Sequence, residues 1–231
     1  NFIFSPANQD GLYDNATIIM NASELIENWG RTEIYNSSGD QVKFFVGPNN
    51  AYSNVETWNG NMTLTTDQFA TDGSYTINTT ITDSGNNTAE IFVGAIFVDN
   101  SPPAFSNLLI NPNTPNEAQD VQINATITDA SNITRIILQV NGKNYTASNN
   151  SNEYYFTIAR GNYTAHDLIN YSWRANDSLG NFNFSSQQFI IANRLPSFIN
   201  GPIANLNFTE NGPPQQINLS FYFNDSDLED I

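Results

Sequence analysis

The chain has 231 residues, with 23 Asp and Glu against seven Lys and Arg, one His, no Cys and a formal net charge of −16. Such an acidic chain is a poor partner for nucleic acid, because neutralising phosphates needs a basic face. The lack of Cys excludes disulfides, thiol nucleophiles and Cys-containing zinc sites. Apolar residues at 39% and aromatic residues at 13% are enough for packed cores.

We expect no membrane span in this segment. Its longest apolar run, residues 91–98, is eight residues long, against about 20 for a helical span. The chain begins at Asn1 without Met or a signal peptide. We therefore interpret it as a processed or partial stretch of a longer protein.

Alternation of polar and apolar residues recurs along the whole chain, without a long helical period, and predicts an all-β protein. Turn signals such as Ser38-Gly39-Asp40, Asn141-Gly142 and residues 177–181 separate the alternating stretches. Short strands at this spacing indicate tandem immunoglobulin-like β-sandwiches. The predicted strands are residues 15–22, 29–36, 41–46, 54–58, 74–82, 88–98, 104–110, 119–128, 133–140, 143–147, 153–159, 168–176, 182–191, 203–209 and 216–223.

Two proline-containing stretches, residues 98–103 and 193–196, have the composition of linkers. The interval between them is close to the ~100 residues of an immunoglobulin-type sandwich. We predict domains at 1–100, 101–193 and 194–231. The last supplies about two strands, too few for a core of its own, so it is either cut off here or completed by another chain.

Several motifs resemble known prokaryotic modules. The first hundred residues resemble FlgD-like immunoglobulin-type domains, through residues 4–14, 34–39, 57–60, 72–75 and 83–86. The second unit resembles other prokaryotic immunoglobulin-like repeats, and residues 208–211 with 221–227 resemble a cadherin-like domain opening. Modules without Cys and dense in glycosylation motifs resemble archaeal surface proteins. The resemblance implies an exported module and is weak for function.

Asparagine is the strongest compositional bias. The chain contains 38 Asn, 19 Ser and 20 Thr, for which chance would produce about six N-x-S/T glycosylation motifs, or sequons. An Asn- and Thr-rich β protein produces some by accident, but the excess is nearly threefold. We predict N-linked glycans and export from the cytoplasm. The 17 sequons begin at Asn15, Asn21, Asn36, Asn61, Asn78, Asn86, Asn124, Asn132, Asn144, Asn149, Asn162, Asn170, Asn176, Asn183, Asn207, Asn218 and Asn224.

Strand geometry is compatible with these sequons. Side chains alternate between the two faces of a strand, so Asn and the Ser or Thr two residues later share one face. Within residues 121–128, the apolar set Val121, Ile123, Ala125 and Ile127 is predicted to face inward, with the sequon at Asn124 opposite. Tyr171 and Trp173 are predicted to face inward in the same way.

A short acidic loop is a candidate calcium site. Asn8, Asp10 and Asp14 provide side-chain oxygens, and Leu12 provides a backbone carbonyl. Ca²⁺ takes 6–8 oxygen ligands, which such a loop partly supplies, although the EF-hand pattern is incomplete. The alternative is an acidic turn held by its own hydrogen bonds.

A second acidic cluster, Asp225, Asp227 and Asp230, lies near the end of the chain, where a divalent ion would relieve repulsion. The alternative is a solvated terminus. Asp99 and Asn100, at the first linker, are a weaker candidate for contributing to an ion site.

Catalysis finds little support, and we expect no enzyme activity. His166 is the only His, and we expect it on a surface loop. Glu24 and Glu27 are a candidate carboxylate pair, which without a substrate cleft does not make a glycosidase. Trp29, Trp58 and Trp173 are either core residues or a sugar-binding surface, and the strand pattern favours the core.

The leading hypothesis is therefore a glycosylated extracellular structural or adhesive protein, such as a surface-layer, filament or adhesin segment. Its partners would be other surface-protein subunits or copies of itself. The alternative is a carbohydrate-binding accessory module of an exported hydrolase.

Overall fold

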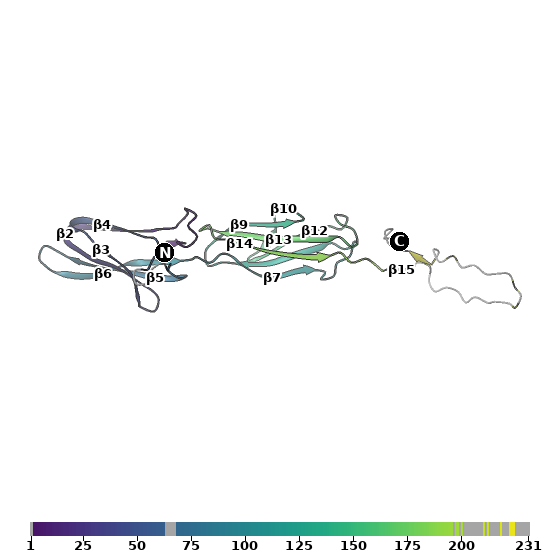
Figure 1. Cartoon of the computed structure of the whole chain (residues 1–231), viewed down its shortest axis with the longest axis horizontal. Helices are drawn as coiled ribbons and strands as arrows, with labels where there is room; N and C mark the ends of the chain where they lie inside the picture. Colours follow the sequence, from purple (N-terminus) through teal and green to yellow (C-terminus); the bar gives the residue numbers. More distant parts are fainter. Residues whose placement is uncertain are drawn as a thin grey trace. The chain divides into compact units, whose positions relative to one another are not determined.

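In a computed structural model, the structure describes residues 2–62 and 68–195, together with 197, 198, 200, 210, 212, 218 and 222–224. The described residues form strands and turns without a helix, so the chain is all-β, built from tandem β-sandwiches (Figure 1). No helix in the described ranges is long and apolar enough to cross a membrane.

Contacts divide the chain into two compact units. Unit 1 comprises Asn1–Phe105, Ile127–Ile137 and Arg174–Ser185, and unit 2 comprises Ser106–Thr126, Leu138–Trp173 and Ser186–Ile231. The predicted domain boundaries at residues 100 and 193 stay predictions.

The first sandwich is built around one long strand. Its six strands follow the order β1-β6-β5-β2-β3, with β4 also paired to β2. Strand β2 pairs with β4 through its first half and with β3 and β5 through its second half. Register shifts interrupt this ladder after Asn21 and after Trp29, which allows the strand to change partners. The strands are β1 (Phe2–Phe4), β2 (Ala16–Tyr35), β3 (Gln41–Val46), β4 (Asn49–Trp58), β5 (Gly73–Thr82) and β6 (Thr88–Val98).

The core of this sandwich gathers apolar side chains from every one of these strands. Trp58 is fully buried between Phe4 and Tyr75, with ring centroids 5.4 Å and 5.3 Å away. Trp29 is 3% exposed, and its indole N–H donates to the Ala51 carbonyl at 2.8 Å. These two tryptophans are core residues, as the strand pattern favoured.

The second sandwich has two four-stranded sheets, ordered β10-β9-β13-β14 and β11-β12-β8-β7. In immunoglobulin lettering, β7, β8, β11 and β12 correspond to strands A, B, D and E, so the sheet β11-β12-β8-β7 has the order D-E-B-A. The sheet β10-β9-β13-β14 has strands C, F and G, with β10 as an extra edge strand. Apart from that edge strand, this is the constant-type immunoglobulin arrangement. The strands are β7 (Ala104–Asn111), β8 (Val121–Thr128), β9 (Ile133–Val140), β10 (Lys143–Tyr145), β11 (Ser148–Asn150), β12 (Glu153–Ile158), β13 (Leu168–Asp177) and β14 (Phe182–Ile190).

The alternation predicted for β8 is confirmed, whereas β13 departs from it at Ser172, which the pattern places on the outward face and which is buried. Val121, Ile123, Ala125 and Ile127 are at most 2% exposed, and Trp173 is fully buried. The neighbouring Tyr171 is also buried. Burying such side chains contributes roughly 1.5–3 kcal/mol each, so these strands are held mainly by their inward faces.

Beyond residue 192 the structure describes little of the predicted third domain. The two-residue strands β15 (Ser197–Phe198) and β16 (Phe223–Asn224) pair antiparallel. The strands predicted at 203–209 and for most of 216–223 lie outside the described residues.

Candidate metal centre and glycosylation sites

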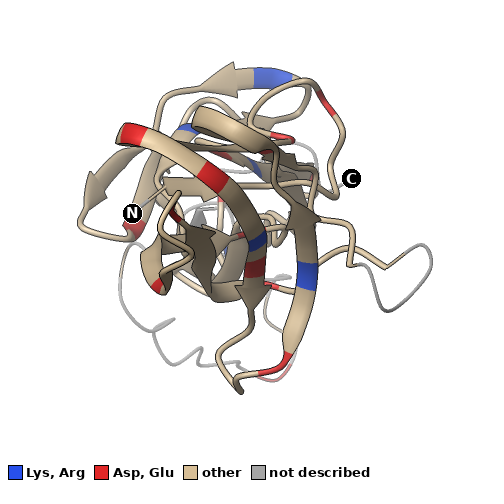
Figure 2. Ribbon diagram, turned by 90° about the vertical axis from the view of Figure 1, so that its left-hand side faces the viewer, with Lys and Arg blue, Asp and Glu red and all other residues tan. Residues whose placement is uncertain are grey.

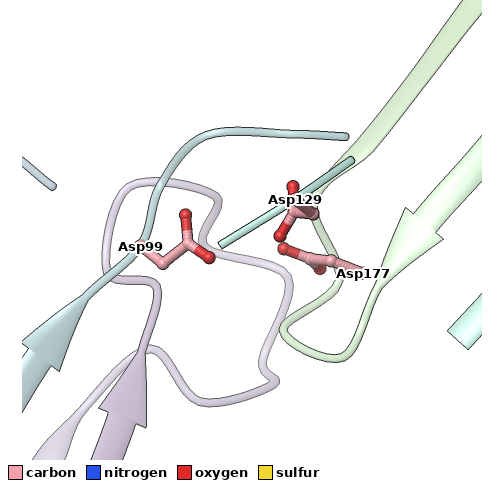
Figure 3. Close-up of side chains that lie close together, drawn as sticks. All are labelled: Asp99, Asp129 and Asp177. Carbon is pink, nitrogen blue, oxygen red and sulfur yellow. The ribbon is translucent and has the colours of Figure 1, made fainter. Parts of the chain in front are cut away.

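Three carboxylates that are distant in sequence meet within unit 1. One side-chain oxygen of each of Asp99, Asp129 and Asp177 lies within 4.8 Å of the others. Figure 3 shows Asp99 reaching in from one side and the other two from the opposite side, with their carboxylate ends turned toward one another. We call this group the aspartate cluster.

Asp177 is placed by the turn that joins β13 to β14. Its Oδ1 accepts the backbone N–H groups of Leu179 at 2.9 Å and Asn181 at 2.8 Å. Gly180 supplies the positive φ of +93° that closes this turn. The predicted turn signal at residues 177–181 is therefore a tight loop organised by the carboxylate of its first residue.

Asp129 follows β8 directly and also organises a short turn. Its Oδ1 accepts the Ser131 backbone N–H at 2.8 Å and faces the Ser131 hydroxyl at 2.7 Å. The same hydroxyl lies 3.1 Å from Oδ2 of Asp177. Ser131 therefore bridges two members of the aspartate cluster.

Asp99 is placed by the end of β6. Its backbone N–H donates to the Phe4 carbonyl at 3.1 Å, which extends the pairing of β6 with β1. The next two residues are tied down by Asp72, which accepts the Asn100 backbone N–H at 2.6 Å and the Ser101 hydroxyl. Asp99 is thus fixed from both sides along the chain.

The Asp99 side chain is fully buried, and neither carboxylate oxygen has a hydrogen-bond partner. Burial, followed by the negative charge of Asp129, raises the pKa of Asp99 to about 6. The charge of Asp72 adds to this increase in pKa. The nearby Ser131 side chain and Ser101 backbone N–H act to lower the pKa of Asp99, but neither of them makes a hydrogen bond of acceptable geometry to its carboxylate.

Asn181 connects the cluster to the N-terminal segment. Its side-chain amide donates to the Asp99 carbonyl at 3.1 Å and to Oδ2 of Asp177 at 2.8 Å, and its oxygen accepts the Ser5 hydroxyl at 2.9 Å. Both Asn181 and Ser5 are buried. This network holds the aspartates in place independently of any ligand.

The loop predicted to bind calcium is hydrogen-bonded within itself. Oδ1 of Asp10 accepts the Leu12 N–H at 2.8 Å, and Oδ2 of Asp14 accepts the Gly11 N–H at 2.9 Å. Oδ1 of Asn8 and Oδ1 of Asp14 are buried without a hydrogen-bond partner. The loop therefore has the Asx hydrogen bonds of the alternative interpretation, and its calcium role stays a prediction.

This loop also packs against the turn that carries Asp177. The Asn8 amide donates to the Leu179 carbonyl at 2.8 Å. A Cβ placed on Gly180 would come within 1.9 Å of Oδ2 of Asp10. The exposed Asp10 carboxylate can move away from such a contact, so it is the positive φ of Gly180 that favours glycine at this position.

The other predicted metal ligands, Asp225, Asp227 and Asp230, lie outside the described residues. Of the aspartate cluster, sequence reasoning had singled out only Asp99. Asp129 and Asp177 lie in turns 48 residues apart, and their convergence depends on how the strands pair.

The sequon asparagines avoid the interior. Burial is described for 15 of the 17, all but Asn207 and Asn224, and none of the 15 is buried. The two buried asparagines among the described residues, Asn54 and Asn181, belong to no sequon. The exposed ones are Asn15, Asn21, Asn86, Asn132, Asn144, Asn149, Asn162, Asn170 and Asn218, and the half-buried ones are Asn36, Asn61, Asn78, Asn124, Asn176 and Asn183.

Three half-buried sequon asparagines use the amide nitrogen that a glycan would occupy. Asn36 donates to Asp40 at 3.1 Å, Asn78 to Glu90 at 3.0 Å and Asn183 to the Pro103 carbonyl at 2.8 Å. Glycan attachment leaves this nitrogen with one N–H, so these sites would have to keep or rearrange their hydrogen bonds.

No family model matches the chain, and no curated protein matches it. Solved structures are similar at low identity. Fibronectin(III)-like modules of Clostridium thermocellum CbhA share 15% identity over 83% of this chain and 90% of theirs, with a TM-score of 0.31. An amphioxus IgVJ-C2 molecule shares 13% identity over 76% of this chain and 97% of its own, at 0.37.

A Ca²⁺-stabilised adhesin, which helps an Antarctic bacterium reach out and bind ice, is 15% identical over 82% of this chain, with a TM-score of 0.39. This chain spans 46% of that adhesin. Because these TM-scores are below 0.5, the likenesses do not bear on function, and the fold assignment rests on strand order.

Proposed function

We propose that this chain is a segment of an extracellular, N-glycosylated structural or adhesive protein, of the kind found in surface layers, filaments or adhesins. The observation that carries this proposal is the nearly threefold excess of sequons, together with their accessibility. Every sequon asparagine of described burial is exposed or half-buried, and none is buried. Composition alone would produce about six sequons, and the observed positions leave these asparagines within reach of a glycosylating enzyme.

The physical role that follows is mechanical. Each sandwich is a stiff, packed body, and glycans on the outward faces shield strand edges from pairing with other chains. Partners of this kind of segment are other surface-protein subunits or copies of itself. The finer assignments, to a FlgD-like first domain, a cadherin-like third domain and an archaeal-type source, belong to the same proposal, as does the absence of catalytic activity.

The test is peptide mapping by mass spectrometry of the protein from its natural source, before and after chemical deglycosylation. We expect added mass on most exposed sequons, for example Asn15, Asn132 and Asn144. Asn54 and Asn181 are the internal control positions, and fragmentation that resolves individual residues should find no glycan on either of them. Bare amides at nearly all sequons would refute the proposal.

A second candidate is a carbohydrate-binding accessory module. Phe182 and Phe184 on β14 are 49% and 57% exposed and stacked with ring centroids 6.2 Å apart. Flat exposed aromatic faces of this type can pack against sugar rings. Binding to a glycan panel that is lost in Phe184→Ala would favour this function, and absence of binding would leave only the first candidate.

A further inference from the structure

We propose that the aspartate cluster, formed by Asp99, Asp129 and Asp177, is a calcium site. The inference goes beyond the glycosylated-protein proposal and is independent of it, because it rests on the contacts of three side chains. The site also differs from the loop at Asn8–Asp14, where Asp10 and Asp14 each accept a hydrogen bond, because Asp99 is fully buried and neither of its carboxylate oxygens accepts one.

The first step is the position of Asp99. A buried carboxylate that lacks a hydrogen bond is costly, because burial removes its hydration and nothing replaces it. The charged side chains that act on Asp99, namely Asp129 and Asp72, are negative as well. Its carboxylate faces the other two members of the cluster (Figure 3). A cation in the space between them would satisfy Asp99 directly.

The second step is a count of hydrogen-bond donors. The Ser131 hydroxyl lies within hydrogen-bond distance of both Asp129 and Asp177, but a hydroxyl has only one proton to donate. Asp177 is otherwise covered by the N–H groups of Leu179 and Asn181. Asp99 receives none, so the negative charge facing the centre of the cluster exceeds what the protein's donors neutralise.

The third step is the identity of the ion. The ligands are carboxylate oxygens, which suit hard cations such as Ca²⁺, Mg²⁺ and Mn²⁺. The chain has no Cys, so thiolate-rich zinc or copper sites are excluded. Oxygens within 4.8 Å of one another fit around an ion bound at about 2.3–2.6 Å. Calcium also tolerates irregular geometry, whereas Mg²⁺ demands a near-ideal octahedron.

Three carboxylates offer up to six oxygens, and water can complete a calcium shell of 6–8 ligands. The network around Asn181 and the two Asx turns already hold the side chains, so little rearrangement is needed on binding. Sites in extracellular modules typically bind calcium with Kd of about 10⁻⁴–10⁻³ M. We expect an affinity in that range.

The test is calorimetric titration of the full chain, produced without glycans, with CaCl₂ and separately with MgCl₂. Wild type should bind Ca²⁺ more tightly than Mg²⁺, and saturating Ca²⁺ should raise its Tm. Asp99→Asn keeps the shape of the side chain and removes its charge. This variant should weaken calcium binding about tenfold or more, while its metal-free Tm stays equal to or above that of wild type.

Asp40→Asn is the matched control, because it makes the same chemical change at an exposed position in the turn between β2 and β3, outside both candidate metal sites. It should leave the affinity of the aspartate cluster unchanged. Equal calcium binding by wild type and Asp99→Asn would overturn the proposal, and so would a wild type without calcium-dependent heat or Tm. Because glycans are absent from this experiment, its result is separate from that of the glycan mapping.

Discussion

At the scale of single residues, two buried polar side chains decide the properties of the region around the aspartate cluster. Asp99 is buried without a hydrogen bond, and Asn181 satisfies several groups at once. Without a cation, the buried Asp99 destabilises the folded state, whereas Asn181 stabilises it. Each can be tested by one substitution.

Without divalent cations, Asp99 should make stability depend on pH. Its folded-state pKa is about 6, against an ordinary value of 3.8 for aspartate, so the folded state binds more protons than the unfolded state between these pH values. Stability contributed by this residue therefore falls as pH rises through that window, by about 3 kcal/mol in total. Urea denaturation from pH 5 to 7.5 in chelator covers about 1.4 kcal/mol of this loss and should show wild type losing stability relative to Asp99→Asn. Parallel pH profiles would contradict this prediction.

Replacing Asn181 should be strongly destabilising. Asn181→Ala removes the amide that donates to the Asp99 carbonyl. It also leaves the Ser5 hydroxyl only the long 3.5 Å bond to Asn100, and each buried unsatisfied group costs roughly 1–3 kcal/mol. We expect a loss of unfolding free energy of about 2–4 kcal/mol, measured by chemical denaturation. Asn152→Ala, at an exposed turn position, is the control and should change stability by less than about 0.5 kcal/mol.

At the scale of elements, the sequence predicted most strands close to their observed bounds. Residues 41–46 and 88–98 were predicted as strands and are β3 and β6. Alternation works here because one face of each strand is packed on a core. Strands β1 and β11, of three residues each, were missed because so short a stretch shows no period.

The long strand β2 was predicted as two strands, at 15–22 and 29–36. The exposed residues around Glu24 and Glu27 break the alternation, and the ladder carries register shifts on both sides of them. The aspartate cluster was out of reach for a related reason. Its members join only when strands from separate parts of the chain are placed in space, which local patterns do not encode.

The turn between β3 and β4 should tolerate an added side chain poorly. A Cβ on Gly47 would lie 2.0 Å from the Trp29 backbone oxygen and 2.5 Å from its Cβ. Gly47→Ala must therefore displace β2, and overpacking of this kind costs typically 1–3 kcal/mol. Gly94→Ala on β6 is the matched control, with nothing within 4 Å. Thermal unfolding should show a lowered Tm for the first variant alone; equal Tm values would contradict the close approach.

At the scale of the whole molecule, the main property is the formal net charge of −16. Figure 2 shows acidic and basic positions on the same strands. Strand β2, for example, carries Arg31 and Glu33, with Thr32 between them. Excess charge of one sign keeps chains apart but also opposes compaction. Soluble, repelling segments suit a protein displayed at high density, and glycans would add to this effect.

Screening this charge should stabilise the chain in a way that is distinct from calcium binding. Raising NaCl from about 0.01 to 0.15 M shortens the Debye length from about 30 to 8 Å. We expect a modest increase in Tm that is the same in wild type and Asp99→Asn. Calcium added at constant ionic strength should then raise the Tm of wild type only. A salt effect confined to wild type would indicate local pairing instead of general screening.

The first and last strands of the first sandwich, β1 and β6, run parallel and pair at Phe2–Ile96, Ile3–Phe97 and Phe4–Val98. Pulling on the N-terminal end of β1 and the C-terminal end of β6 would slide the strands past each other instead of peeling them apart. All the bonds between them would then be loaded together and would have to rupture at nearly the same extension. Forced unfolding of this sandwich should accordingly be slow, a useful property for a component that bears tension.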